Sequence, residues 1–416
     1  MARRGQQTRR RAGARKSSDK TTPIVIILVA VLVLGIGVYS FMHFWKAPQV
    51  PPTAQPPVAN APEKAPVSSP DEIDAMVQEM SLEEKAYQML FVTPESITGV
   101  GQAVAAGQAT KDAVERYPVG GMVYFAQNIL SPDQTKTMLH NTQSYAKIPL
   151  FLAVDEEGGR VSRIASNPDM GVEEIPSMWE IGETGDVTKA YEVGEELSDM
   201  LTELGFNVDF APVADLLVNA DNTAIGDRAF GDEPGVVSDM VAATVDGLQT
   251  NGVSATLKHF PGHGSTTEDS HNGYTASTRS YAQLSENEFL PFRAGIEADA
   301  DFVMISHITM VSAVEEDVPA SLSKTVVTDW LIEELGYKGI IITDSFRMNA
   351  ITDNYAQSEA IVMAIDAGVD MILMPTDTEA AKNAIVEAVK SGKLSEERID
   401  ASVKKILSCK AKRGLL

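Results

Sequence analysis

The sequence predicts an α/β fold, a (β/α)8 TIM-type barrel that forms a single domain over residues 71–416, preceded by one N-terminal transmembrane helix. Two observations predict the barrel. Short β-branched runs alternate with segments of helical periodicity, which is typical of a parallel sheet covered by helices. Eight such runs lie in a domain of about 350 residues, which matches a closed barrel better than a doubly wound open sheet.

Each predicted strand is a short aliphatic run. The eight runs are 88–93, 122–125, 150–155, 208–213, 255–260, 302–307, 340–344 and 371–375. Helical periodicity covers 134–145, 188–204, 233–249, 283–298, 324–335, 356–367 and 379–390, and a last helix closes the chain at 396–412. Only about 40 residues follow the eighth strand, which is room for two helices and not for a second α/β domain.

The first 45 residues predict a membrane anchor. Residues 1–20 carry eight basic residues against one acid, which predicts a basic cytoplasmic tail under the positive-inside rule. Residues 21–45 are an uncharged apolar run that spans roughly 35 Å as a helix, enough to cross a bilayer. The run is longer than the apolar part of a signal peptide, and no small-x-small cleavage site follows it. We therefore expect a single-pass protein of the cell membrane with an extracytoplasmic domain.

The segment after the anchor predicts a spacer. Residues 46–70 contain eight prolines and no aliphatic residue larger than valine, so they cannot pack a core. A polyproline chain of this length reaches at most about 75 Å. The spacer is expected to hold the domain away from the membrane but still near it.

Charge and cysteine content limit the partners of the domain. The chain carries a net charge of -24, of which residues 1–20 contribute +7 and residues 21–70 contribute +1, so residues 71–416 carry -32. A domain this acidic is a poor partner for nucleic acid, whose phosphates require a basic face. The single cysteine, Cys409, allows no disulfide within the chain, so the domain depends on its own packing.

Polar residues follow several of the predicted strands at the same end. They are Asp155, Lys258, His259, His307 and Asp344. A charged residue can simply mark the point where a strand stops. Their recurrence at the C-terminal ends of four different predicted strands instead indicates the barrel rim, where the loops after the strands build active sites.

The segment LKHFPGHGSTTEDSH, residues 257–271, contains three of the six histidines of the chain. A metal site is one hypothesis, because histidine and carboxylates are ligands of zinc and iron. A Pro-Gly pair stands between His259 and His263, so these two cannot share a helix face. Lys258 beside them would also repel a divalent cation, which weakens the metal hypothesis without removing it.

The second hypothesis for this segment is proton transfer. Asp269 lies two residues before His271, so in an extended loop its carboxylate can orient the imidazole and tune its pKa. Such a histidine is a proton shuttle near neutral pH. Glycine, serine and threonine make the loop permissive, so that it can bring His271 to a substrate at the rim.

Asp344, in GIIITDSF, is an isolated carboxylate at the tip of the seventh predicted strand. Such a group suits a nucleophile or a stabiliser of positive charge. A retaining glycosidase needs one carboxylate at the anomeric carbon and a separate acid/base for the leaving oxygen. His271 with Asp269 can replace the usual second carboxylic acid.

Six motifs together carry a resemblance to a known family. They are VDEEGGRVSR (154–163), APVAD (211–215), GDRAFGDEP (226–234), KHFPGHGSTTEDSH (258–271), SHI (306–308) and ITDSFRM (342–348). In this order they resemble the signatures of family 3 glycoside hydrolases, and most closely those of the β-N-acetylglucosaminidase branch. The resemblance covers nearly all of residues 71–416, and the KHFPGHG…DSH match is highly specific.

The resemblance implies roles for individual residues. Asp344 matches the family's nucleophile, which forms a covalent glycosyl-enzyme, and His271 matches the acid/base with Asp269 as its partner. Five residues match those that hold the N-acetylglucosamine ring through its hydroxyls: Asp155, Arg163, Arg228, Lys258 and His259. No metal or other cofactor is implied. The chain departs from the family pattern at Ser265 and at Ser345-Phe346, which leaves the pocket wall and the loop open to difference.

The hypothesis that follows is a retaining exo-β-N-acetylglucosaminidase (a β-N-acetylhexosaminidase), with the anchor and spacer favouring fragments of peptidoglycan as its carbohydrate substrate. The natural aglycone and the oligomeric state stay open. A mechanistic rival uses the 2-acetamido group of the substrate as nucleophile, with the pair Asp155-Glu156 positioning it. Two rival functions stay open as well: a catalytically silent, membrane-tethered protein that binds cell-wall glycans, and a metal-dependent barrel hydrolase.

Overall fold

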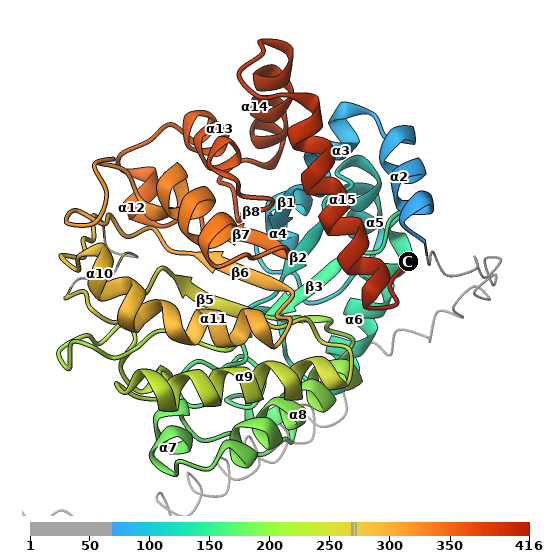
Figure 1. Ribbon diagram of the computed structural model, residues 1–416. Coiled ribbons are helices and arrows are strands. Elements are labelled where there is room, and N and C mark those ends of the chain that lie inside the picture. The colour runs from blue at the N-terminus through green and yellow to red at the C-terminus, as the bar shows by residue number, and fades with distance from the viewer. Residues whose placement is uncertain (1–68, 268–269, 271–272) are drawn as a thin grey trace, which may run out of the picture. The chain divides into compact units, whose positions relative to one another are not determined.

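The computed structural model describes residues 69–267, 270 and 273–416 (Figure 1). The chain divides into two units, residues 1–64 and 65–416, and all described residues belong to the second unit. The predicted basic tail, the predicted transmembrane helix and nearly all of the predicted spacer therefore lie outside the described residues. No helix within residues 69–267 or 273–416 combines the length and the apolar character that crossing a bilayer requires.

The described residues form an α/β fold with parallel strands. Seven of the eight predicted runs contain a strand, and the run 122–125 overlaps β2, which begins one residue earlier. The strands are β1 (Leu90–Val92), β2 (Gly121–Val123), β3 (Phe151–Val154), β4 (Val208–Asp209), β5 (Thr256–Phe260), β6 (Phe302–Ile305), β7 (Ile340–Thr343) and β8 (Ile372–Leu373). They are shorter than predicted because pairing stops where the chain turns toward the loops. One sheet has the order β4-β3-β2-β1-β8, and the other has the order β5-β6-β7.

Isolated parallel bridges connect the edges of the two sheets. Val208 of β4 pairs with Ser254, and Val213 pairs with Lys258 of β5. At the other edge, Ile342 of β7 pairs with Met371, directly before β8. The strands thus neighbour one another in chain order, and β8 pairs back with β1 through Leu90 and Ile372.

Helices surround the strands (Figure 1). Those at predicted positions are α6 (Pro132–Tyr145), α8 (Val187–Leu204), α9 (Pro234–Thr250), α11 (Phe289–Glu297), α13 (Gln357–Ala367), α14 (Thr378–Lys390) and α15 (Glu396–Lys412). The predicted helix 283–298 begins with α10 (Tyr281–Gln283) and the π-helical turn η4 (Leu284–Glu288), which lead into α11. The predicted helix 324–335 is the π-helical η6 (Thr325–Glu334). The two helices expected after the eighth strand, α14 and α15, are confirmed.

Six short helices were not predicted: α2 (Pro70–Glu79), α3 (Leu82–Gln88), α4 (Pro94–Thr98), α5 (Gln108–Arg116), α7 (Met178–Glu183) and α12 (Asn349–Thr352). Three of them, α2, α3 and α7, begin with a capping box. Ser69, Ser81 and Ser177 each pair with the glutamate three residues later. Helix α2 therefore begins at Pro70, the last residue of the predicted spacer.

Large side chains fill the space between the two sheets. The ring of Phe151 at the start of β3 contacts that of Phe302 at the start of β6, with centroids 5.1 Å apart. Phe91 of β1 meets Phe210, which follows β4, at 5.5 Å. Lys410 of α15 lies over the Phe151 ring at 5.1 Å. Helix α15 therefore packs against the N-terminal ends of the strands, which leaves the C-terminal ends for the loops that carry the predicted site.

Candidate active site

Asp155 and Lys258 meet at the C-terminal ends of their strands. Asp155 directly follows β3, and Lys258 lies inside β5, so parallel strands bring the two side chains to one edge. Lys258 Nζ lies 2.9 Å from Asp155 Oδ1. Lys258 is only 2% exposed, whereas the Asp155 side chain is 18% exposed. The carboxylate of Asp155 is thus held by a buried cation and remains accessible from the loop side.

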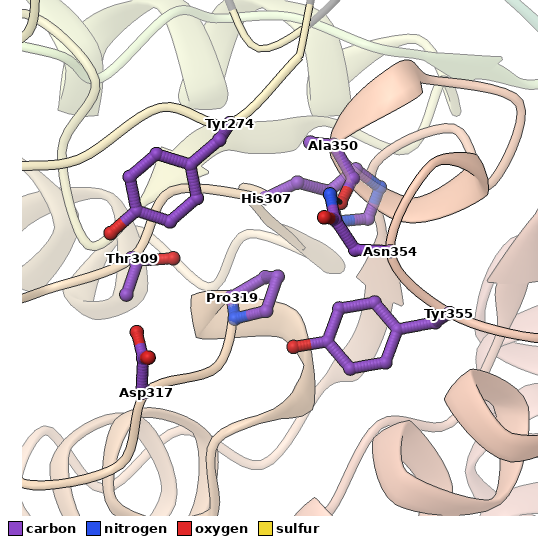
Figure 2. Close-up of a pocket in the computed structure, with 8 residues that line it drawn as sticks. All are labelled: Tyr274, His307, Thr309, Asp317, Pro319, Ala350, Asn354 and Tyr355. Atoms are coloured by element: carbon purple, nitrogen blue, oxygen red, sulfur yellow. Dashed lines mark hydrogen bonds between the residues drawn. The ribbon is translucent and has the colours of Figure 1, made fainter.

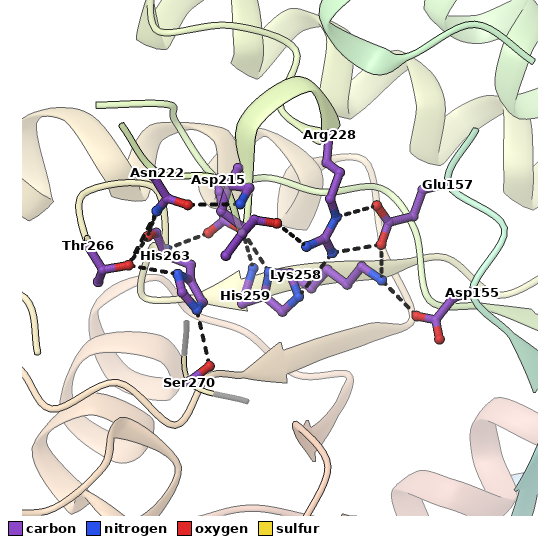
Figure 3. Close-up of polar contacts among 12 residues, drawn as sticks. Asp155, Glu157, Asp215, Asn222, Arg228, Lys258, His259, His263, Thr266 and Ser270 are labelled. Atoms are coloured by element: carbon purple, nitrogen blue, oxygen red, sulfur yellow. Dashed lines mark hydrogen bonds and ion pairs between the residues drawn. The ribbon is translucent and has the colours of Figure 1, made fainter. Parts of the chain in front are cut away.

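Glu157 is a site residue that the sequence analysis left without a role. It pairs with Arg228 through two contacts of 2.8 Å and with Lys258 Nζ at 2.5 Å (Figure 3). Burial by itself would raise the pKa of Glu157, but the charges of Arg228 and Lys258 hold it well below its usual range. The two cations are correspondingly stabilised, and the pKa of Lys258 rises although burial opposes its charge. Asp155, Lys258, Glu157 and Arg228 form one continuous ion-pair network.

Asp215 is the second missed residue, and it holds the KHFPGHG segment in place. Its Oδ2 lies 2.8 Å from His259 Nδ1 and accepts the backbone N–H of His259 at 3.1 Å. Its Oδ1 accepts the backbone N–H of His263 at 2.7 Å. Burial would raise the pKa of Asp215, but His259 and His263 together lower it. The motif APVAD contained this aspartate, and only its partners in space reveal what it does.

His259 is buried with both ring nitrogens facing protein groups. Nδ1 faces Asp215, and Nε2 lies 3.5 Å from Arg228 Nη2. An arginine only donates, so Arg228 is the donor in its contact with Nε2. His259 therefore joins the ion-pair network to Asp215, and its contact with a sugar stays a prediction.

His263 braces the turn that follows β5. Its Nδ1 lies 3.0 Å from Thr266 Oγ1, its Nε2 lies 3.2 Å from Ser270 Oγ, and Asn222 donates to its carbonyl at 2.9 Å. Burial lowers the pKa of His263, as does the nearby His259. The proposed proton-transfer pair, Asp269 and His271, lies outside the described residues. The prediction of its role therefore stays a prediction.

Asp344 directly follows β7, as predicted for the candidate nucleophile. Its backbone N–H donates to Ile305 O at 2.9 Å, which fixes it to the end of β6. Its Oδ1 accepts the backbone N–H of Ser345 at 2.7 Å, and the side chain is half-buried. The charge of Asp344 acts on His263, whose pKa it tends to raise. Asp344 thus lies at the same rim as the segment that ends β5.

Arg163 and Glu156 occupy the loop after β3. Arg163 Nη2 is 3.9 Å from Asp155 Oδ2, and the arginine side chain is 31% exposed. Glu156 is fully buried and accepts the backbone N–H groups of Arg163 and Ile164 at 2.6 and 2.8 Å. Burial raises the pKa of Glu156, and these hydrogen bonds oppose the rise. Glu156 therefore shapes the loop, and its buried carboxylate is engaged by these hydrogen bonds, which disfavours the acid pair of the substrate-assisted rival.

No group of three or more potential metal ligands occurs among the described residues. Lys258 and Arg228 place two cations among the carboxylates near β5, where a divalent ion would be repelled. The chemistry of this donor set fits the recognition of hydroxyl groups by charge-assisted hydrogen bonds.

Comparison with known proteins places this arrangement in a family. The model of the glycosyl hydrolase family 3 N-terminal domain matches residues 81–409. The chain belongs to family 3 of the glycosyl hydrolases. The match includes β1 to β8 and every described residue of the site, so the resemblance of the six motifs is confirmed at the level of the family.

Individual relatives agree with this placement. The chain is 33% identical over 330 residues to beta-hexosaminidase A of Pseudoalteromonas piscicida, over 72% of this chain and 54% of that protein. It is 34% identical over 270 residues to a beta-hexosaminidase of Stenotrophomonas maltophilia, over 64% of this chain and 78% of the relative. The chain thus spans about half the length of the first of these two relatives.

A solved structure shows the same fold. The family 3 beta-N-acetylglucosaminidase of Paenibacillus sp. str. FPU-7 superposes with a TM-score of 0.76 at 35% identity. The superposition covers 81% of this chain and 63% of that one. The chain therefore shares its fold with a family 3 beta-N-acetylglucosaminidase.

Proposed function

We propose that the protein is a retaining exo-β-N-acetylglucosaminidase that removes terminal β-linked N-acetylglucosamine. One observation carries the proposal: a half-buried carboxylate, Asp344, shares the strand-end rim with the ion-pair network around the accessible Asp155. Membership of family 3 and the beta-hexosaminidase relatives support the same activity. The proposal also takes the two bridged sheets as one closed (β/α)8 barrel, in which the C-terminal rim is the site of catalysis.

The ion-pair network is suited to hold a sugar ring. Asp155 accepts hydrogen bonds from ring hydroxyls, and the exposed part of Arg163 donates to them. An ammonium has three donors, and Asp155 and Glu157 engage two of those on Lys258. The third donor is then available to a hydroxyl oxygen. Since Glu157 and Asp215 fix Arg228 and His259, the binding groups are positioned before the substrate arrives.

The proposed reaction proceeds through a covalent intermediate. The Asp344 carboxylate attacks the anomeric carbon while the bond to the leaving oxygen breaks. His271, oriented by Asp269, donates its proton to that oxygen. A water then attacks the anomeric carbon of the glycosyl-enzyme, His271 takes one proton from the water, and the Asp344 carboxylate is released. The product keeps the β configuration.

Peptidoglycan fragments are the proposed substrate, and the outer face of the cell membrane is the proposed location. Residues 1–70 support this proposal, because a basic tail, an apolar run and a proline-rich spacer would tether an exported domain to the membrane. The membrane is then the only partner besides the carbohydrate substrate that the proposal requires. Nucleic acid is not expected, since residues 71–416 carry a charge of -32.

Trapping of the intermediate tests the mechanism. The full-length protein is incubated with a 2-deoxy-2-fluoro β-glycoside that carries a good leaving group, and its intact mass is followed. We expect one added glycosyl unit, which peptide mapping assigns to Asp344. A protein that turns over a chromogenic β-N-acetylglucosaminide without ever gaining mass contradicts the covalent mechanism. If neither the wild type nor Asp344→Ala hydrolyses that substrate, the result would favour the rival function, a catalytically silent protein that binds cell-wall glycans.

A further inference from the structure

A cavity of about 300 Å³ is lined by residues to which the proposed function gives no role, and one of them, His307, contacts the residue after Asp344 (Figure 2). We call it the tyrosine pocket. Its lining includes Tyr274, Tyr355, Asp317, Asn354, Thr309 and His307. The volume is in the range of sites for small ligands.

His307 connects the tyrosine pocket to the candidate nucleophile. It follows β6, is 1% exposed, and places Nε2 at 3.1 Å from the backbone oxygen of Ser345, the residue after Asp344. Its ring stacks on Phe346 with centroids 5.7 Å apart. The pocket is formed by the loops after β5, β6 and β7, whereas the network that we assign to the sugar ring comes from β3, the loop after β4, and β5. The candidate sugar-holding network and the tyrosine pocket are therefore built by different groups of strands and loops, and His307 links the pocket to the residue after Asp344.

The walls of the tyrosine pocket are held by backbone pairing. Thr309 donates its N–H to Thr275 O at 2.9 Å and accepts the N–H of Ser277 at 2.9 Å, which fixes the segment that carries Tyr274. An antiparallel bridge joins Thr309 to Pro319, two residues after Asp317. Tyr355 donates its N–H to Ile351 O at 2.9 Å, at the end of α12. The pocket is thus built from three loops that are fixed to one another or to a helix.

The lining combines aromatic walls with polar groups. Figure 2 shows the rings of Tyr274 and Tyr355 on either side of Pro319. Tyr274 is 58% exposed and Tyr355 is half-buried, so both present ring surface to a ligand. Aromatic faces beside an amide and a hydroxyl suit a pyranose, whose C–H faces pack on rings while its hydroxyls form hydrogen bonds.

The position of the pocket favours the leaving sugar as its ligand. The network around Asp155 is assigned to the N-acetylglucosamine ring, and the pocket reaches the residue after Asp344 from a different group of loops, through His307.

One charge distinguishes the pocket. Asp317 is exposed and is the only carboxylate among the described residues that line it. The pKa of Tyr355 is raised by burial and then by the charges of Asp317 and Glu359, which places the field of these carboxylates at the tyrosine. The carboxylate of a ligand bound in the pocket would be repelled by Asp317.

We propose that the tyrosine pocket is the subsite for the leaving sugar. Asp317 makes the pocket prefer a leaving sugar whose ring substituents are neutral or positively charged, and disfavour a leaving sugar that carries a free carboxylate. This inference rests on the proposed function, whose substrate class it narrows. Glucosamine, N-acetylglucosamine, and a muramoyl residue whose lactyl group is amidated meet the requirement. A muramic acid residue with a free lactyl carboxylate does not.

Three disaccharides test the selection. Each has N-acetylglucosamine β-linked to a leaving sugar, which is glucosamine, N-acetylglucosamine or N-acetylmuramic acid with a free lactyl group. We measure kcat/KM from the N-acetylglucosamine released by the full-length protein. Wild type is expected to prefer the first two. Asp317→Asn should reduce the preference for the neutral over the anionic leaving sugar by about fivefold, and salt should reduce it in wild type.

Matched variants separate a pocket effect from a general charge effect. Glu315→Gln removes an exposed acid two residues away that does not line the pocket, and it should leave the preference unchanged. Tyr355→Ala should lower kcat/KM for all three disaccharides by about tenfold through the loss of ring contact. The proposal is overturned if Asp317→Asn leaves the preference intact, or if Glu315→Gln changes it equally.

A direct binding measurement keeps the pocket testable if the enzyme assay fails. If wild type cleaves none of the disaccharides, the proposed function fails, and titration calorimetry with free glucosamine and free N-acetylmuramic acid then examines the pocket alone. Tighter binding of glucosamine that is lost in Asp317→Asn supports the selective site. Equal binding of the two sugars, or binding unchanged in Asp317→Asn, rejects it.

Discussion

Replacement of Glu157 by glutamine tests how strongly the ion-pair network holds the rim. The Glu157 side chain is 1% exposed, and those of its partners Lys258 and Arg228 are 2% and 14% exposed. Without this carboxylate, Lys258 keeps Asp155 as its partner among the described residues, and Arg228 keeps a backbone oxygen and His259. Removing one partner of a buried pair typically costs about 3–5 kcal/mol. Glutamine still offers one acceptor oxygen, so we expect about 3 kcal/mol less stability.

The stability difference between wild type and Glu157→Gln should depend on pH. The folded-state pKa of Glu157 lies below its unfolded value because Arg228 and Lys258 outweigh the effect of burial. A carboxylate of this kind stabilises the fold fully above the unfolded pKa of about 4.3, and the contribution is lost as the pH falls toward the folded pKa. The difference should therefore be constant near neutral pH and shrink below about pH 4.

Urea unfolding followed by the fluorescence of Trp179 and Trp330 measures both effects. Glu379→Gln is the matched control, because Glu379 pairs with Arg116 at 2.8 Å but is 50% exposed, and such pairs contribute about 1 kcal/mol or less. We expect a clear fall of the midpoint for Glu157→Gln and almost none for the control. Equal midpoints for the two variants at neutral pH, or a difference that persists unchanged in acid, would refute the argument.

Three further predictions concern the reaction. Asp344→Ala should lower kcat on a chromogenic β-N-acetylglucosaminide by about a thousandfold or more, while Asp353→Ala, an exposed acid after α12, should retain activity. His271→Ala should lower kcat/KM by about 100-fold or more, and the loss should be smallest for glycosides whose leaving group needs no proton. Full activity of this variant would contradict the assignment of His271 as the acid/base. Asp215→Asn leaves the backbone N–H of His263 without its charged acceptor, so kcat/KM and stability should both fall, the latter by about 1–3 kcal/mol in urea unfolding.

The fold could be predicted because its signal is local and repeated. Each buried strand reads as a run of aliphatic residues, as in Ile340–Thr343, and each covering helix repeats its apolar face along α8 or α9. The missed helices α2 and α3 are short, and their start signal is a capping box and not a long apolar stripe. A search for periodicity alone passes over such helices.

The candidate site was predictable where a residue follows its strand and unpredictable where its role depends on a distant partner. Asp155 and Asp344 stand at strand ends in the sequence, and the structure places them there. Glu157 stands in an acidic, glycine-rich run that looks solvent-exposed. Its burial depends on Arg228, which lies 71 residues away, and no local pattern contains that information.

The segment from Lys258 to Ser270 shows why order along the chain decides the chemistry more than composition does. Lys258 and His259 lie within β5, so the strand directs them into the ion-pair network, and Asp215 fixes the backbone of both His259 and His263. His263 then faces Thr266 and Ser270 and closes the turn. Both histidines of this segment, His259 and His263, thus have structural partners on both ring nitrogens. The proton-transfer hypothesis therefore depends on His271 alone, and replacing this residue is the most direct test of the proposed mechanism.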